Sequence, residues 1–136
     1  VAPPGTPGLP QGTPAGSRSD RPVGLIDLYR TLSELAGLPA PDEAVTGQSL
    51  LPLLRDPSAP WARPVVTTNG RGHHAVRSER YRYIRYPDGE EELYDHDKDP
   101  NEFINLANKP DYKYVIDQFK KWIPENFAPD LGGRNG

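Results

Sequence analysis

Two segments of the chain repeat apolar residues at the period of an α-helix. In residues 23–36 the repeating residues are leucines, at positions 25, 28, 32 and 35. They form a single stripe, so the sequence predicts an amphipathic helix whose leucines face a hydrophobic core. Asp20 is a predicted N-cap residue, and Gly37, which tolerates a left-handed conformation, is expected to end the helix.

The second helical segment lies at residues 111–123 and carries a wider apolar face. The apolar residues at helical spacing are Tyr112, Val115, Ile116, Phe119, Trp122 and Ile123. Pro110 suits the first turn of this helix, and Pro124 prevents its continuation. Between the two helices, a shorter apolar run in residues 49–61 predicts one or two helical turns.

Between residues 63 and 94 the apolar period changes to two, as in β-strands. Residues 63–69 are rich in β-branched side chains, and residues 73–86 contain two further short strands. The Pro-Asp-Gly sequence at 87–89 is a hairpin signal that returns a fourth strand beside the third. We therefore predict an α+β fold, in which a small antiparallel sheet of about four strands packs with the C-terminal helix and follows one amphipathic helix.

Charged residues follow the last two predicted strands. Arginines alternate with other residues in 80–86, and acidic residues open the returning strand at 90–92. Opposite charges on neighbouring strands are expected to form cross-strand pairs, each contributing about 0.2–1 kcal/mol and favouring one register. After these strands, the sequence predicts a turn at Asp99-Pro100 and then a short helical segment.

Proline and glycine, 17 and 13 residues respectively, are concentrated at the two ends of the chain. Such segments bury too little apolar surface to offset the entropy lost on ordering. We therefore expect a flexible linker at 1–21, a helix with its connecting segment at 22–62, a small subdomain at 63–125 and a flexible tail at 126–136. The chain begins at Val1 and contains no methionine, as expected of a processed product, a cloned fragment or one piece of a longer protein.

Charge and cysteine content argue against several classes of protein. A formal net charge of -3 does not suggest a nucleic-acid-binding protein. The sequence has no cysteine, so we expect neither a disulfide framework nor a thiolate metal site. Because no apolar run approaches the roughly 18 residues of a membrane span, we also expect no membrane segment.

Two groups of residues imitate metal sites. The acidic run at 95–99 resembles the start of a calcium-binding loop, but Pro100 and Leu106 stand where such a loop needs glycine and glutamate. His73 and His74 are adjacent in a predicted strand, so they point to opposite faces and cannot bind one metal together. We therefore expect a solvated acidic turn, and no metal site or cofactor in this chain.

Arginine is the most frequent charged residue of the predicted sheet. The arginines there are Arg71, Arg77, Arg80, Arg82 and Arg85. Most of them are expected to be solvated and salt-bridged, and recognition of an anion by one or two of them is the alternative. The sequence contains no serine–histidine–aspartate elbow, phosphate loop or zincin helix, so its residues provide no complete catalytic site.

Three stretches together resemble the C-terminal part of a formylglycine-dependent sulfatase, of the bacterial iduronate-2-sulfatase-like kind. They are DRPVGLIDLYRTLSELAGLP from residue 20, GQSLLPLLRD from residue 47 and GRGHHAVRSERYRYIRYPDGEEELYDHDKDPNEFINLA from residue 70. Each stretch is weak by itself, but their order and spacing are specific. The resemblance implies a small C-terminal subdomain, a four-stranded antiparallel sheet with a packed helix, that accompanies a large α/β catalytic domain.

The resemblance also implies an activity, the hydrolysis of sulfate esters that are often carried by carbohydrates, with calcium and a formylglycine residue in the intact enzyme. The family's formylglycine arises in a Cys/Ser-x-Pro-x-Arg motif, whereas the arginine after Ser58 comes one place late, at Arg63. No catalytic or metal role is therefore assigned here, and the chain is expected to be inactive alone. Its expected partners are the N-terminal catalytic domain of the parent and the sulfated substrate. Family members are commonly periplasmic or extracellular, but the sequence leaves the localisation of this chain open.

Two other functions stay open at this point. One is an independent module that binds an anionic glycan on the arginine face, and the other is a purely structural subdomain. The leucine stripe of residues 23–36 has an alternative as well. Part of it would lie uncovered in this chain if the large domain of the parent packs on it.

The predicted substrate-binding residues are Arg71, His73 and His74, which lie in the glycine-rich loop between two strands. In the sulfatases that the chain resembles, the sequence Gly-Arg-Gly-Asn-His-Ala-Val is common here, so His74 matches the histidine and His73 replaces the asparagine. We predict that Arg71 and His74 face the substrate side of the parent enzyme and donate hydrogen bonds to an anionic or hydroxylated group. In the alternative interpretation, His74 is a hydrogen-bonded strand residue and Arg71 a solvated charge.

Overall fold

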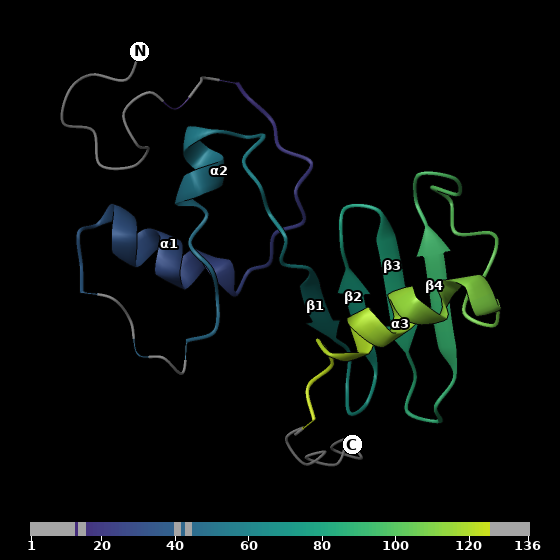
Figure 1. Cartoon of the computed structure of the whole chain (residues 1–136). Helices are drawn as coiled ribbons and strands as arrows, with labels where there is room; N and C mark the ends of the chain where they lie inside the picture. The colour runs from purple at the N-terminus through teal and green to yellow at the C-terminus, as the bar shows by residue number, and fades with distance from the viewer. Residues whose placement is uncertain (1–12, 14–15, 40–41, 43–44, 126–136) are drawn as a thin grey trace, which may run out of the picture. The chain divides into compact units, whose positions relative to one another are not determined.

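The computed structural model describes residues 13, 16–39, 42 and 45–125 (Figure 1). The chain divides into two compact units, Val1–Ala62 and Arg63–Gly136. Most of the predicted flexible linker and all of the predicted tail at 126–136 lie outside the described residues. None of the helices in the described part of the chain combines the length and the apolar character needed to cross a membrane.

The first unit contains two helices, α1 (Asp27–Leu35) and α2 (Leu51–Arg55). α1 ends as predicted, because Gly37 has a φ of 66° and Leu38 N–H donates to Ser33 O at 2.9 Å, as in a Schellman motif. The predicted N-cap was wrong. The N-cap residue is Ile26, and the carboxylate of Asp27 accepts a hydrogen bond from Gly24 N–H instead of Asp20 capping the helix.

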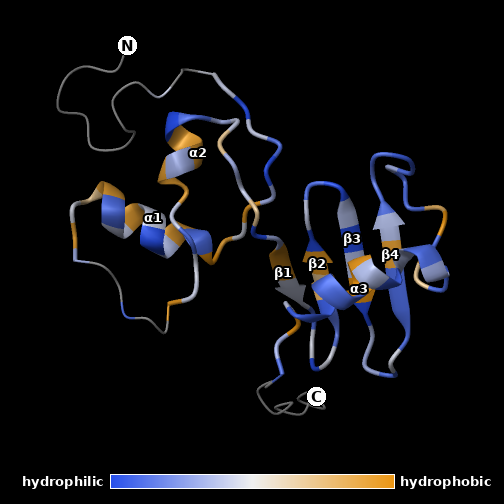
Figure 2. Ribbon diagram, viewed as in Figure 1, coloured by the Kyte–Doolittle hydropathy of each residue, from blue (hydrophilic) through white to orange (hydrophobic). Residues whose placement is uncertain are grey.

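The orientation of α1 is the reverse of the core-facing prediction. Leu28 and Leu32 are 43% and 61% exposed, whereas Asp27 and Thr31 are buried. Figure 2 shows apolar segments (orange) alternating with polar ones along α1. Asp27 Oδ1 accepts from Gln48 N–H at 2.9 Å, and the Thr31 hydroxyl accepts from Leu50 N–H at 2.9 Å. The polar face therefore packs on the segment that leads to α2, because it satisfies the backbone donors of that segment.

The second unit is an antiparallel sheet whose four strands follow in chain order, as predicted. The strands are β1 (Val65–Thr68), β2 (His74–Arg77), β3 (Tyr81–Arg85) and β4 (Glu91–Asp95). A 3-10 turn, η1 (Pro110–Tyr112), leads into α3 (Lys113–Lys120), which lies across one face of the sheet (Figure 1).

The core of this unit lies between the sheet and α3. Val76, Tyr83 and Leu93 pair across three neighbouring strands and are fully buried. They pack with four further buried residues from the C-terminal half of the chain, Leu106, Ile116, Phe119 and Ile123. The alternation of the strands and the apolar face of the last helix therefore meet as predicted, and the α+β prediction is confirmed.

The predicted pairing of opposite charges across β3 and β4 holds at Arg85 but not at Arg82, and a second local prediction was wrong. In the β3–β4 register, Arg85 faces Glu91, but Arg82 faces Tyr94 and pairs instead with Glu102 of the following loop at 2.9 Å. The predicted helical segment after Asp99 is an irregular loop. Its polar side chains bond the backbone directly: Asn105 accepts from Leu93 N–H at 3.1 Å, which competes with helix formation.

Candidate functional site

The loop between β1 and β2 is held by its glycines and by the neighbouring hairpin. Gly70 and Gly72 have φ values of 78° and 74°, in the left-handed region that favours glycine. A Cβ at Gly72 would lie 3.4 Å from the backbone of Pro87, in the turn between β3 and β4. In a four-stranded meander these two turns lie at the same end of the sheet, so the loop and the hairpin turn are neighbours there.

The structure brings the three predicted substrate-binding residues into this loop but points them in different directions. Arg71 is exposed at the tip. The ring of His73 lies against that of Tyr86, with a centroid distance of 4.8 Å. His74 is only 1% exposed, and its Nδ1 lies 2.9 Å from the hydroxyl of Thr68 on the paired strand.

His74 is held in the neutral form. Its burial, and after that the positive charge of Arg85 and the neighbouring His73, lower the pKa of the imidazole below its ordinary value of about 6.5. A neutral imidazole donates one hydrogen bond and accepts one. Arg71, at the exposed tip, presents a full positive charge directly to solvent, while His74 supports the strand beneath it.

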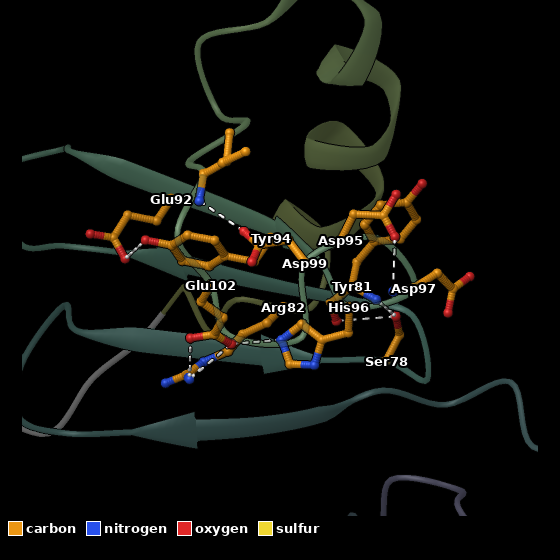
Figure 3. Close-up of polar contacts among 11 residues, drawn as sticks. Ser78, Tyr81, Arg82, Glu92, Tyr94, Asp95, His96, Asp97, Asp99 and Glu102 are labelled. Atoms are coloured by element: carbon orange, nitrogen blue, oxygen red, sulfur yellow. Dashed lines mark hydrogen bonds and ion pairs between the residues drawn. The ribbon is translucent and has the colours of Figure 1, made fainter.

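A second polar cluster lies at the opposite end of the sheet, where β4 runs into the next loop (Figure 3). Figure 3 shows Arg82, Glu102 and His96 pointing toward one another, and His96 Nε2 lies 2.6 Å from Glu102 Oε1. Glu102 has a φ of 59°, which is strained for a residue with a side chain. The contacts with Arg82 and His96 hold this strained residue in place.

Asp95 forms the second ion pair of this end. The Arg80 guanidinium binds the Asp95 carboxylate through two nitrogens, at 2.6 and 2.8 Å, and Asp95 is 1% exposed. The hydrogen bonds from Arg80 lower the pKa of Asp95, and hydrogen bonds from His96 and Arg82 outweigh the burial of Glu102 and lower its pKa. The predicted solvated turn was therefore wrong for Asp95.

The acidic cluster does not fit a metal. Its two most enclosed carboxylates, Asp95 and Glu102, already bind cationic side chains. Among residues 13, 16–39, 42 and 45–125, no group of three or more histidines, aspartates or glutamates is arranged to hold an ion. The cluster instead fixes the loop after β4 to the sheet.

Sequence reasoning missed the roles of His96 and Glu102. Glu102 lies 20 residues from Arg82, and its contacts depend on a loop that crosses back over the strand end. The sequence feature that could have indicated these roles is the run of acidic residues after the arginine-rich strand. Such a run indicates that ion pairs form, but not which residues form them.

The chain matches one protein-family model and several curated sulfatases. Residues 6–128 match the family described as N-sulphoglucosamine sulphohydrolase, C-terminal. The chain is 40% identical to a sulfatase of Formosa agariphila over 117 residues, which cover 85% of this chain and 22% of the relative. It is 39% identical to the Delta 4,5-hexuronate-2-O-sulfatase of Bacteroides thetaiotaomicron, with coverages of 74% and 22%.

A solved structure supports the same relationship. The structure of a 2-O GAG sulfatase superimposes with a TM-score of 0.55 at 35% identity, over 71% of this chain and 22% of that one. The chain thus spans about a fifth of the length of the sulfatases that it matches. By the match of the family model over most of its residues, this chain belongs to the N-sulphoglucosamine sulphohydrolase C-terminal family.

Proposed function

We propose that the chain is the non-catalytic C-terminal portion of a sulfatase that acts on sulfated carbohydrates, and that its β1–β2 loop borders the substrate site. The observation that carries the proposal is the 40% identity to a sulfatase that extends over nearly the whole chain but over only 22% of the relative. Two further relatives, a hexuronate-2-O-sulfatase and a 2-O GAG sulfatase, indicate sulfated sugars as the substrate class.

The nucleophile and the metal belong to the rest of the protein in this proposal. Asp95 and Glu102, the enclosed carboxylates of the cluster after β4, are engaged by arginine and histidine, and the Ser58 motif departs from the family pattern. The contribution of this chain is then recognition. Arg71 offers a guanidinium group that can bind a sulfate through two parallel hydrogen bonds, and His73 offers a partly exposed imidazole beside it.

His74 has an indirect role in the proposal. It packs beneath the loop, bonded to Thr68, and holds the backbone from which Arg71 and His73 extend. The rival function, an independent module that binds glycans on the arginine face, has less support. Arg80 and Arg82 on that sheet are engaged in ion pairs with Asp95 and Glu102.

The test is Arg71→Ala in the whole protein. We expect kcat/KM for a sulfated disaccharide to fall at least about tenfold, a loss of roughly 1.4 kcal/mol in transition-state binding, while the melting temperature stays unchanged. The matched control is Arg55→Ala, which removes an exposed arginine at the end of α2. Equal kinetics in the two variants would contradict a substrate role for the loop.

The variants His73→Ala and His74→Ala distinguish direct contact with the substrate from structural support of the loop. His73→Ala should lower kcat/KM without affecting stability, because the ring is partly exposed. His74→Ala removes a buried side chain and should lower both kcat/KM and the melting temperature. Two results together would contradict a substrate role for both histidines. They are a loss of activity in His74→Ala that is explained by unfolding, and unchanged activity in His73→Ala.

A further inference from the structure

A surface pocket lies on the β4 side of the second unit, between the beginning of β4 and the start of α3. Its volume is about 340 Å³, and its walls come from Glu91, from residues 107–110 and from four side chains of α3. η1 and α3 begin beside β4 before α3 runs back across the sheet (Figure 1). We call it the lysine pocket, because Lys109, Lys113 and Lys120 line it.

Hydrogen bonds to β4 hold one wall of the lysine pocket in place. The Asn105 amide accepts from Leu93 N–H at 3.1 Å and donates to Glu91 O at 3.2 Å. Leu106 N–H donates to Leu93 O at 2.8 Å, so the chain is fixed to the edge of β4 directly before it forms the pocket. On the α3 side, Ile116 is 5% exposed and packs in the core. Both walls of the pocket are therefore positioned by the fold.

Two of the three lysines have carboxylate partners, and the two pairs differ. Glu91 Oε1 accepts from the Tyr83 hydroxyl and from Lys120 Nζ, both at 2.6 Å. Tyr83 is fully buried, so this pair joins α3 to the core of the unit. In the pair of Lys113 with Asp117, at 2.9 Å, the side chains are 76% and 46% exposed. Exposed pairs contribute little to stability, so Lys113 can exchange Asp117 for another anion.

Lys109 has no such partner. Its side chain is exposed, and among residues 13, 16–39, 42 and 45–125 its ammonium group takes part in no hydrogen bond or ion pair. Three lysines and two carboxylates line the pocket, so it carries a net positive charge. Asn108 adds an amide that both donates and accepts, and Pro110 adds a small apolar surface. A ligand that complements this lining has an anionic group, several hydroxyls and an apolar ring face, which describes an acidic or sulfated sugar.

The lysine pocket and the β1–β2 loop lie at the same end of the sheet. His74 lies opposite Arg85, and Arg85 lies opposite Glu91, so one row of residues leads from the end of the loop to the pocket. Neighbouring strands are about 4.8 Å apart, so about 10 Å of sheet separates β2 from β4. Arg85 is exposed in the middle of the row. The pocket is therefore a neighbour of the loop and not a part of it.

We infer that the lysine pocket binds an anionic sugar unit of a glycan whose sulfated unit is bound by the β1–β2 loop. The inference rests on the proposed function, in which the substrate is a sulfated carbohydrate. Lys109 and Lys113 bind a carboxylate or a sulfate of that unit, while Lys120 stays bound to Glu91. Because the two sites bind different units of one chain, the pocket favours long substrates over short ones.

The test is Lys109→Gln/Lys113→Gln in the whole protein, with a glycosaminoglycan hexasaccharide and the matching disaccharide. We expect the Kd of the hexasaccharide, measured by isothermal titration calorimetry, to rise at least about fivefold. kcat/KM should fall to a similar extent for the hexasaccharide and stay unchanged for the disaccharide, because the disaccharide reaches only the loop. The melting temperature should stay the same, because both lysines are exposed.

Two further variants make the result specific. Lys98→Gln/Lys121→Gln removes the same charge from two exposed lysines outside the pocket and should leave both substrates unaffected. Asp117→Asn releases Lys113 and should lower the Kd of the hexasaccharide. Several outcomes would overturn the inference: equal losses in the two lysine variants, unchanged binding in Lys109→Gln/Lys113→Gln, equal falls in kcat/KM for both substrates, or a higher Kd in Asp117→Asn.

Modified hexasaccharides identify the anionic group. A modification acts at the lysine pocket if it removes the difference in Kd between the unmodified protein and Lys109→Gln/Lys113→Gln. Such an effect of carboxyl reduction assigns a uronate to the pocket, and such an effect of desulfation assigns a sulfate. Both results support the inference, and a difference that survives both modifications contradicts it.

Turnover tests the proposed function separately. A whole protein that hydrolyses neither substrate, but still binds the hexasaccharide through the lysine pocket, contradicts the function and not the pocket.

Discussion

His74 combines burial with a titratable ring, and this environment predicts a fold whose stability decreases in mild acid. The imidazole is 1% exposed and bonded to Thr68, and burial is the main cause of its lowered pKa. In the unfolded chain the same ring titrates near its ordinary value of about 6.5. As the pH falls below that value, the unfolded state therefore binds a proton more readily than the folded state does.

We predict that the free energy of unfolding is constant with respect to His74 above about pH 6.5 and decreases as the pH falls from there toward 5. Urea unfolding at a series of pH values measures this slope. His74→Gln should remove it, although the variant is less stable at every pH. His73→Gln is the control and should retain most of the slope, because burial is the main cause of the lowered pKa of His74. A slope that survives in His74→Gln would assign it to another group.

The carboxylates act in a different pH window. Asp95 and Glu102 have lowered pKa values, so the stability that they contribute is present above their ordinary values of about 4 and is lost as the pH falls below them. The loss of stability from the carboxylates therefore begins at a lower pH than the loss from His74. The two residue types can be distinguished in the same experiment.

At the scale of elements, α1 and the segment before α2 are held together by hydrogen bonds and a close backbone contact. Gly47 allows the backbone of this segment to touch the end of α1, and Thr31 and Asp27 bond the residues that follow Gly47. A helix that is fixed through its polar side in this way has no need of its leucines for local stability.

Gly47→Ala should separate the helix from its connecting segment. The new Cβ would lie 2.0 Å from Ile26 O, so the backbone must move and the nearby hydrogen bonds must lengthen. We expect a loss of about 1–3 kcal/mol in stability and faster amide hydrogen exchange across α1, with no change in the sheet. Thr46→Ala, at an exposed neighbouring position, is the control. Unchanged exchange in α1 would mean that the two segments move independently.

At the scale of the whole molecule, the chain is one part of a longer catalytic protein in the proposed function. It spans about 22% of the curated sulfatases that it matches. A sulfate ester is hydrolysed only where a nucleophile and a charge clamp meet. In the proposed function, this chain contributes recognition by Arg71, and the nucleophile comes from the rest of the protein.

We therefore predict that the purified 136-residue chain does not hydrolyse an aryl sulfate, with or without added calcium. Addition of the separately produced N-terminal part should restore turnover. The measurement is release of the aryl alcohol, with the N-terminal part alone as the control. Hydrolysis by the chain alone would show that the chain contains the nucleophile, and would contradict this prediction.

The sequence by itself determined most of the segments that are helices and strands, although the helix predicted after Asp99 is a loop. The spacing of apolar residues predicted α1, α3 and the four strands, because a periodic apolar face defines its own secondary structure. Turns with strong local chemistry were predictable as well: Gly37 and Gly89 have the left-handed φ values that only glycine adopts easily. The order of the motifs also indicated the sulfatase family, which the family match confirms.

Only the tertiary structure decided what each face contacts. Periodicity defines the leucine stripe of α1 but not which side of the helix is buried, and that choice came from hydrogen bonds made by Asp27 and Thr31 to residues about 20 positions away. In the same way Arg82 pairs with Glu102 across 20 residues, and not with the opposite strand. Such contacts depend on where a loop returns in space, and no local pattern of residues encodes that position.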